Sequence, residues 1–260
     1  MRGPFVPRPP ALRRRQALLA AALAPVAASL AQAATQVVRI GRTDYVSPLT
    51  DIEERVLGLA FDRIGVRCQF VPIPLLRLIE MANDGQVDAD IGRIPEVADR
   101  FPNLIRLSTP ICQTEVAVYG RTADFPRRTR SEIAGMSIGI VRGVFVLSKH
   151  TQGMKVIEVQ NFEAITNMMV NQRIDAAVAI YLDTEVQLRN RQVAEMVRWP
   201  YLWASEPLHF LLHKSHAALV PKLEEALARM AKEGLIQRYY ADGLKKIGLA
   251  PLLAAQAAPR

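Results

Sequence analysis

The stretch Gly85-Gln86-Val87-Asp88-Ala89 decides the fold, because the chain contains a second version of it, Gln172-Arg173-Ile174-Asp175-Ala176. In both places a segment with helical spacing ends, two residues turn, and a short apolar strand begins around an Asp-Ala pair. The two copies predict one α/β unit used twice, and therefore a chain of two lobes.

The first half of the chain alternates between strand and helix patterns around the first copy. Thr50 and Glu53 have the spacing of a capping box at a helix start, and Gly65 ends that helix. This order predicts a parallel sheet with right-handed crossovers. The expected strands are 37–41, 68–73 and 87–91, and the expected helices are 50–64 and 75–83.

The second half repeats the alternation around the second copy. A late strand and a long amphipathic helix follow it, and Gly234 separates that helix from a shorter one. The segment after Lys245 is rich in alanine and proline, and we expect a frayed tail over 248–260. The expected strands are 116–119, 137–141, 156–159, 174–179 and 208–212, and the expected helices are 162–170, 217–232 and 236–240.

Residues 1–34 have the pattern of an export signal. Five arginines and no acid precede an apolar run over 17–30, which ends at Ala31-Gln32-Ala33. This run contains a proline and is shorter than the roughly 20 apolar residues that cross a bilayer. We therefore expect cleavage near Ala33 or Ala34 and a periplasmic location, and the Arg14-Arg15 pair is compatible with the twin-arginine route.

Charge and cysteine content exclude several classes of function. The formal charge of +8 would fall to +3 once the five arginines of the signal are removed, and aromatic residues are sparse, so we expect no nucleic-acid partner. Cys68 and Cys112 could pair in an exported protein or remain separate thiols, and their spacing fits no zinc site. We expect no cofactor and no metal.

Four stretches occur in the order seen in a known family. They are 85–89, Arg100 with 107–110, 133–143, and 223–240. Together they resemble the family 3 extracellular solute-binding proteins, which are periplasmic receptors of polar amino-acid ABC transporters. The resemblance extends over about 37–243.

The resemblance implies the type II periplasmic binding protein fold. In this α/β fold each of two lobes is a mainly parallel sheet flanked by helices, and two crossing strands join the lobes. Carried over, lobe 1 would be 36–113 plus 214–247 and lobe 2 would be 114–213. The hinges would fall near Gln113 and His213.

The resemblance also implies a cleft that holds a small carboxylate-bearing ligand. Arg100 falls where an arginine of the family grips the ligand carboxylate, although it could instead be a solvated surface charge. Arg93 follows a strand at a position that faces the cleft in the family, and a solvated charge is again the alternative. The remaining candidates are Asp44 and Tyr45 in a lid-like loop, Gly92, the helix-start residues Arg142, Gly143 and Val144, and the weaker candidates Arg77 and Tyr181.

One position departs from the family pattern. The family places an aspartate five residues after the strand's Asp-Ala, where it binds the ligand's ammonium, but here that position is Ile180. An apolar residue cannot pair with a buried cation. This predicts a ligand that is anionic or lacks a free α-amino group, unless an alignment shift brings Asp183 to the site.

The expected function is that of a receptor without chemistry, which delivers its solute to an inner-membrane ABC permease. A periplasmic dehydratase-like enzyme acting on a cyclic carboxylate is one alternative, and a sensor receptor for a histidine kinase or chemoreceptor is another. His209, His213 and His216 have spacings that resemble metal ligands on a helix, but His209 and His213 fall within and at the end of a predicted strand. We therefore interpret them as ordinary polar positions.

Overall fold

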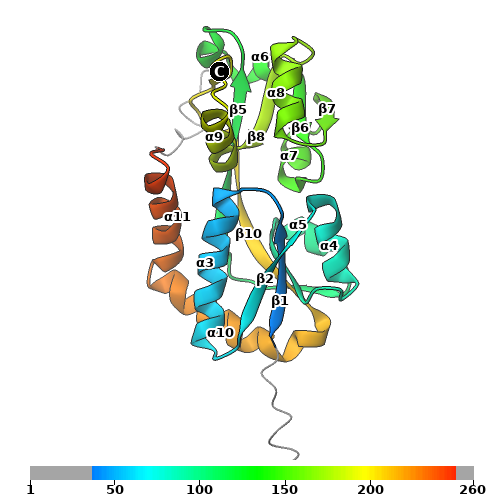
Figure 1. Ribbon diagram of the computed structural model, residues 1–260, viewed down its shortest axis with the longest axis vertical. Coiled ribbons are helices and arrows are strands. Elements are labelled where there is room, and N and C mark those ends of the chain that lie inside the picture. The colour runs from blue at the N-terminus through cyan, green and yellow to red at the C-terminus, as the bar shows by residue number, and fades with distance from the viewer. Residues whose placement is uncertain (1–36, 250–260) are drawn as a thin grey trace, which may run out of the picture. The chain divides into compact units, whose positions relative to one another are not determined.

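Two groups of strands share one long strand, β10 (Ala204–His213), as Figure 1 shows. The structure is a computed structural model that describes residues 37–249. The predicted export signal and nearly all of the predicted tail lie outside these residues. Among the described helices, none has the length and apolar character needed to span a membrane.

The strand order is β2-β1-β3-β10-β5-β8-β6-β7, with β4 beside β10 and β9 beside β5. Within it β1 pairs in parallel with β2 and β3, while β6 pairs in parallel with β7 and β8. The α/β class and the two mainly parallel groups predicted from the sequence are confirmed. The strands are β1 (Val38–Thr43), β2 (Cys68–Ile73), β3 (Ala89–Arg93), β4 (Leu104–Arg106), β5 (Cys112–Gly120), β6 (Ser137–Val141), β7 (Lys155–Val159), β8 (Ala176–Ile180) and β9 (Val197–Arg198).

Helices surround both groups of strands. We use lobe 1 for the elements around β1–β4 and lobe 2 for those around β6–β9. The lobe 1 helices are α3 (Pro48–Arg63), α4 (Leu75–Asn83), α5 (Pro95–Ala98), the 3-10 helix η2 (Lys214–Leu219), α10 (Val220–Lys232) and α11 (Leu235–Lys246). The lobe 2 helices are the 3-10 helix η1 (Phe125–Arg127), α6 (Arg130–Ala134), α7 (Phe145–His150), α8 (Phe162–Val170) and α9 (Tyr181–Asn190).

The repeated Asp-Ala sequence makes the same structure in both lobes. The Asp88 carboxylate accepts from the backbone N–H of Arg39 at 2.7 Å, and the Asp175 carboxylate accepts from that of Ser137 at 2.9 Å. The backbone N–H of Asp88 also donates to the carbonyl of Arg39, and that of Asp175 donates to the carbonyl of Ser137. Gly85 and Gln172, the first residues of the two copies, both have positive φ, at 72° and 55°. Each aspartate thus binds the first strand of its lobe, β1 or β6, from a position just before β3 or β8. The strands β3 and β8 themselves begin two residues later than predicted.

The two crossing strands pair with each other where the lobes meet. Cys112 of β5 pairs with Leu208 of β10, and the next residue of β10, His209, already pairs with Arg93 of β3. The second crossing therefore lies near Leu208 and not at His213, which pairs with Leu104 inside lobe 1. The described residues belong to one compact unit, so the lobe bounds inferred from the sequence stay a prediction.

The start of α3 differs from the prediction. Ser47 is the N-cap, and its side chain accepts from the Thr50 N–H at 3.0 Å, with Pro48 in the first turn. The capping box expected from Thr50 and Glu53 is therefore wrong, because the helix begins two residues earlier. Thr50 instead lies with its hydroxyl 3.3 Å from that of Thr43, and Glu53 is buried.

The two cysteines are unpaired, and the three histidines singled out in the sequence each contact a different residue. Cys68 and Cys112 are both free thiols. Each of the three histidines has its own partner, namely the Leu107 carbonyl for His209, the Ser215 hydroxyl for His213 and the Asp88 carboxylate for His216. Within residues 37–249 no group of His, Cys, Asp and Glu has the arrangement of a metal site.

Two glycines give a test of this packing. An added Cβ at Gly41 of β1 would collide with the Leu78 side chain and lie 3.3 Å from the Ala89 carbonyl, whereas one at Gly58 of α3 would meet nothing within 4 Å. We expect Gly41→Ala to lower the free energy of unfolding by about 1–3 kcal/mol through overpacking. Gly58→Ala should raise it by about 0.4–1 kcal/mol. Urea unfolding of both variants measures the difference, and equal effects would contradict the packing of β1 on α4.

Candidate functional site

A small cavity of about 80 Å³ lies between the two lobes beside the crossing strands, and we call it the enclosed cavity because most of its lining residues are buried. Its walls come from the loop after β1, from α3, from the end of β3, and from the starts of α7 and α9. It is therefore a place where one small molecule would touch both lobes at once. The polar residues that line it are Thr43, Tyr45, Ser47, Thr50, Glu53, Arg93, Thr114 and Asp183.

A buried ion pair forms the lobe 1 side of this cavity. Arg93 donates from Nε to Asp90 Oδ2 at 2.8 Å, and the two side chains are 10% and 0% exposed. Both residues belong to β3, which carries them from the repeated Asp-Ala motif to the cavity. Backbone hydrogen bonds from Ile91 and Gly92 also stabilise the Asp90 carboxylate, whereas Arg93 Nη2 has no hydrogen-bond partner among the described residues. Arg93, which lines the cavity, thus has one unused donor.

Glu53 of α3 lies beside this pair. Burial raises the pKa of its carboxyl group to about 8, with Arg93 lowering that pKa and Asp90 raising it. Near neutral pH the group is therefore largely protonated, which makes it able to donate as well as accept. Its Oε1 has no partner among the described residues. Gly92 leaves room for it, because a Cβ at position 92 would collide with Glu53 Oε1.

Asp183 of α9 closes the cavity from lobe 2. The Ser47 hydroxyl lies 2.9 Å from both of its carboxylate oxygens, and the Leu49 N–H donates to it at 3.3 Å. Burial raises the Asp183 pKa to about 6, against the lowering effect of the hydrogen bonds from Ser47 and Leu49. The acid that is missing at Ile180 is therefore present one helical turn later, and both residues line the cavity.

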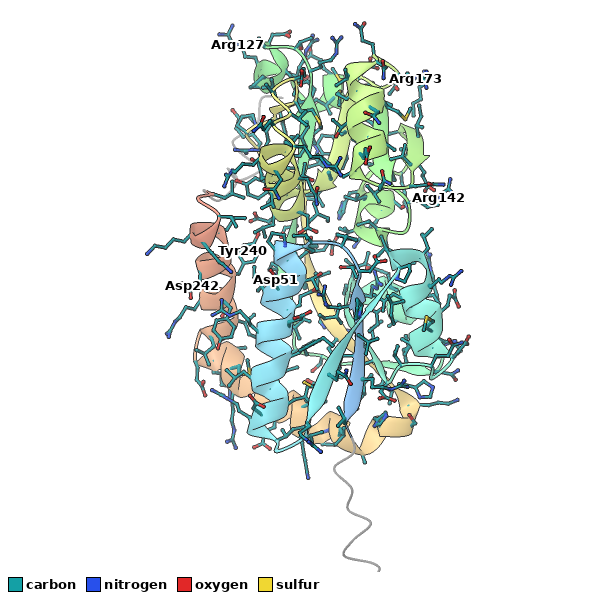
Figure 2. The ribbon with its side chains drawn as sticks, viewed as in Figure 1. Asp51, Arg127, Arg142, Arg173, Tyr240 and Asp242 are labelled. Atoms are coloured by element: carbon teal, nitrogen blue, oxygen red, sulfur yellow. The ribbon has the colours of Figure 1, made fainter. Side chains whose placement is uncertain are left out.

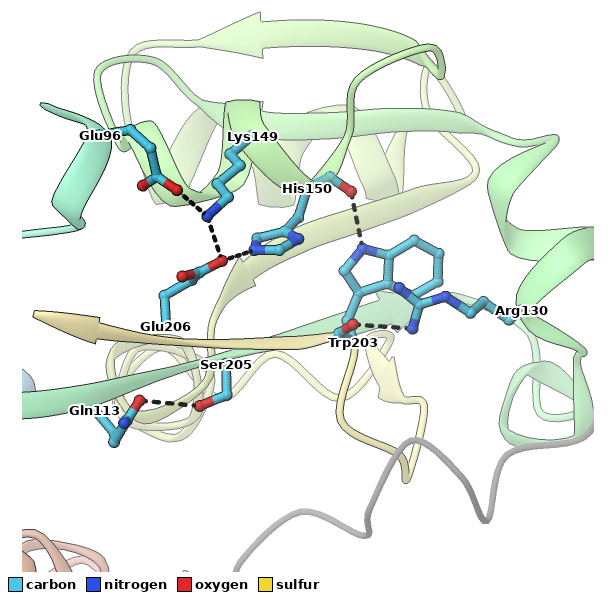
Figure 3. A network of polar contacts seen from close by, with 8 residues as sticks. All are labelled: Glu96, Gln113, Arg130, Lys149, His150, Trp203, Ser205 and Glu206. Carbon is cyan, nitrogen blue, oxygen red and sulfur yellow. Dashed lines mark hydrogen bonds and ion pairs between the residues drawn. The ribbon is translucent and has the colours of Figure 1, made fainter. Parts of the chain in front are cut away.

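A second set of polar contacts joins the lobes. Lys149 of α7 lies 2.6 Å from Glu96 of α5 and 2.6 Å from Glu206 of β10 (Figure 3). Glu206 also lies 2.7 Å from His150 Nε2. Because Glu96 belongs to lobe 1 and Lys149 to lobe 2, these contacts hold the lobes together beside the crossing strands.

The sequence-predicted residues fall into three places. Tyr45, Gly92, Arg93 and Val144 line the enclosed cavity. Arg100 and Gly143 line a second cavity of about 480 Å³, where the Arg100 guanidinium lies 5.6 Å from the Phe145 ring centroid. A third cavity, of about 540 Å³, is lined by the predicted residues Asp44, Arg77 and Arg142. Tyr45 and Val144 line this cavity as well as the enclosed one.

Two of the predicted residues are engaged elsewhere. Tyr181 is buried, and the Arg198 guanidinium lies 5.1 Å from the centroid of the tyrosine ring. Tyr181 lines none of the three cavities. Arg142 lies at the edge of lobe 2 (Figure 2), where it pairs with Glu158 at 3.2 Å. Neither side chain is aimed into the enclosed cavity.

The sequence prediction missed Glu53, Ser47, Thr114 and Asp90. For Glu53 a signal was available, because it falls on the same helical stripe as Val56, Leu57 and Ala60. A carboxyl group on an apolar stripe is costly to bury and is a common sign of a site. Ser47 and Thr114 gave no such signal, since isolated hydroxyl residues occur throughout a sequence.

Comparison with known proteins places this geometry in context. Residues 51–242 match the family described as bacterial extracellular solute-binding proteins, family 3. An uncharacterized protein of Shewanella oneidensis is 25% identical over 197 residues, which cover 72% of this chain and 73% of that protein.

Solved structures show the same fold at low sequence identity. The GluR0 ligand-binding core in complex with L-glutamate has a TM-score of 0.69 at 14% identity, covering 81% of this chain and 99% of that one. An ancestral arginine-binding protein bound to glutamine has a TM-score of 0.64 at 19% identity, covering 79% and 96%. The fold class predicted from the sequence, a type II periplasmic binding protein, is therefore confirmed.

The raised pKa of Glu53 gives a test by pH. Between its usual value of 4.5 and about 8, the folded chain keeps a proton that the unfolded chain releases. The free energy of unfolding should therefore fall as pH rises through this window, by on the order of a few kcal/mol. Glu53→Gln cannot titrate and should remove this part of the decline, as urea unfolding at pH 5, 6.5 and 8 would measure.

Glu80→Gln, at an exposed position of α4, is the matched control and should keep the wild-type slope. A Glu53→Gln variant whose stability declines as steeply as that of the wild type would show that Glu53 is not the buried titrating group.

Proposed function

This chain belongs to the bacterial extracellular solute-binding proteins of family 3, and we propose that it is a periplasmic receptor that captures a small polar solute between its lobes and delivers it to an ABC permease. The proposal is for binding without chemistry. It rests on the polar groups around the enclosed cavity.

Three buried polar atoms with no partner among the described residues carry this proposal. They are Arg93 Nη2, Glu53 Oε1 and Thr114 Oγ1, all on residues of the cavity wall. A buried polar group left without a hydrogen bond costs about 1–3 kcal/mol, so such groups are rarely gathered without a purpose. A solute that brings its own donors and acceptors would satisfy them.

The mixture of groups favours an amino-acid-like solute. Arg93 supplies a cationic donor for a carboxylate, which a guanidinium binds with suitable geometry. Asp90 and Asp183 place negative charge nearby, and a dicarboxylate would add to it, whereas an amino group would offset it. The expectation of a ligand that is anionic or lacks a free α-amino group rested on Ile180, so the presence of Asp183 in the cavity wall argues for a ligand that carries both an acid and a donor.

Residues of both lobes would contact the same solute. Arg93 and Glu53 come from lobe 1, Asp183 from lobe 2, and Thr114 from the crossing strand β5. A ligand that binds both lobes stabilises the arrangement in which they meet, and this shift in population is what a permease can read.

An enzyme remains the alternative that one observation favours. Glu53 is a buried carboxyl group with a pKa of about 8, and such a group can act as a general acid near neutral pH. Incubation with cyclic carboxylates, followed by chromatography of the products, separates the two functions. Turnover that disappears in Glu53→Gln would support the enzyme, while unchanged solute recovered from a stable complex would support the receptor.

Arg93 is the residue on which binding should depend most. We expect Arg93→Ala to lose about 2–5 kcal/mol of binding free energy, at least thirtyfold in Kd, because the solute carboxylate would be left unpaired. A thermal-shift screen of amino acids and dicarboxylates on the wild type identifies the solute, and isothermal titration then measures the loss. Arg173→Ala, at an exposed position far along lobe 2 (Figure 2), is the control.

Removing Arg93 also leaves Asp90 buried without its partner, so Arg93→Ala/Asp90→Asn serves as a second variant with that charge removed. If the folded double variant binds the solute as tightly as the wild type, the carboxylate is held elsewhere and this assignment is wrong.

The sequence motif and the structure assign different roles to Arg100. The motif assigns it the carboxylate, whereas its guanidinium lies over Phe145 in the second cavity and does not line the enclosed one. We expect Arg100→Ala to change Kd by less than about fivefold, since an exposed cation–π contact contributes roughly 0.5–1 kcal/mol. A loss as large as that of Arg93→Ala in the same titration would return the carboxylate to Arg100.

A further inference from the structure

The third cavity adjoins the enclosed one and is much larger. Its volume of about 540 Å³ falls within the range of small-molecule sites. The two cavities share wall residues from both lobes, namely Tyr45, Leu75, Val144, Ile180 and Asp183. A molecule seated in the enclosed cavity would therefore have this space directly beside it.

Apolar side chains line the third cavity on both lobes. Leu75 and Leu76 face it from the start of α4, while Leu147 and Phe162 contribute from α7 and α8. Ile180 is part of the wall between the two cavities, where the family motif would place an acid. Such a lining would hold hydrocarbon better than a charged group.

Exposed apolar residues cluster around this cavity. Four large apolar side chains of the described residues are strongly exposed, and they are Tyr45 at 40%, Val46 at 67%, Leu76 at 57% and Val170 at 47%. Tyr45 and Leu76 line the third cavity, and Val46 is adjacent to Tyr45 in the chain. Exposed apolar surface gathered at one concave place marks a binding site.

Three of the six charged residues that line the third cavity are in ion pairs, the other three being Asp44, Arg77 and Asp183. Arg142 pairs with Glu158 at 3.2 Å, and Arg191 pairs with Glu163 at 3.4 Å. These pairs reduce the need for a charged group on the ligand at this end. The polar requirement lies instead at the enclosed cavity, where the buried donors and acceptors are found.

We propose that the third cavity is a subsite for an apolar substituent of the same solute whose polar head binds at Arg93. This inference rests on the proposed receptor function and makes it narrower. The solute is an amino-acid-like acid with an aliphatic or aromatic side chain of several carbons. Its head lies between Glu53, Arg93 and Asp183, and its side chain passes Val144 and Ile180 to reach Leu76.

Two homologous series test this assignment by isothermal titration. One is alanine, 2-aminobutyrate, norvaline and norleucine, with phenylalanine added, and the other is propanoate to hexanoate. Burying each methylene should tighten binding about fourfold, the equivalent of ~0.8 kcal/mol. We expect Kd to fall with chain length within the amino-acid series, and phenylalanine to bind more tightly than alanine.

A charge at the mouth of the subsite should remove this trend. Leu76→Asp is expected to flatten the dependence of Kd on chain length while leaving the binding of alanine within about threefold of the wild type. Val170→Asp is the matched control, because Val170 is similarly exposed but lines none of the three cavities. Both positions are exposed, and melting temperatures would verify that both variants fold; Leu76→Ala is a milder second variant.

Three results would overturn the subsite. Equal binding along the series would show a receptor whose ligand does not use the cavity, and the proposed function would stand. An unchanged slope in Leu76→Asp would place the side chain elsewhere. If no member of either series binds at millimolar concentration, the subsite is also refuted, and the wider screen with the Arg93 variants decides separately whether the chain is a receptor.

Discussion

The buried ion pair between Arg93 and Asp90 is the constraint on which the site depends. A guanidinium that is only 10% exposed must be neutralised, and Asp90, on the same strand, does so with one of its two oxygens. The guanidinium thereby keeps one unpartnered donor, Nη2, on a residue that lines the cavity. The pair also shapes its surroundings, because Glu53 can lie against it only as a largely neutral acid and only because position 92 is a glycine.

The sequence predicted the fold well because the signals that define it are local and repeated. Asp88 and Asp175 each bind the backbone of the first strand of their lobe, after a residue with positive φ, so similar sequences made the same turn twice. Strands such as β2 and β6 and the helix α8 have the predicted bounds for the same reason. The short helices α5 and α9 were missed, since four residues at α5 and a weakly amphipathic α9 give no clear periodicity.

The site was predicted only in part because it is assembled from residues far apart in the chain. Arg93, Gly92, Tyr45 and Val144 were found, but Ser47 and Asp183 meet across 136 positions, and no local pattern announces such a contact. The family motif directed attention to Ile180 and away from Asp183, although both lie on one side of the same helix start. The motif specifies one position by its distance along the chain from Asp175. At a helix start, however, residues three apart such as Ile180 and Asp183 lie on the same face.

Ile180 and Asp183 place an apolar and an acidic side chain where the two cavities meet. Asp183 accepts from the Ser47 hydroxyl, and both Asp183 and Ile180 line the enclosed cavity and the third cavity. For the proposed solute, an isoleucine at position 180 would offer hydrocarbon beside the acid of Asp183, whereas an aspartate there would add a desolvation cost to an apolar substituent. The position where this chain departs from its family is therefore the position that would set which solutes it accepts.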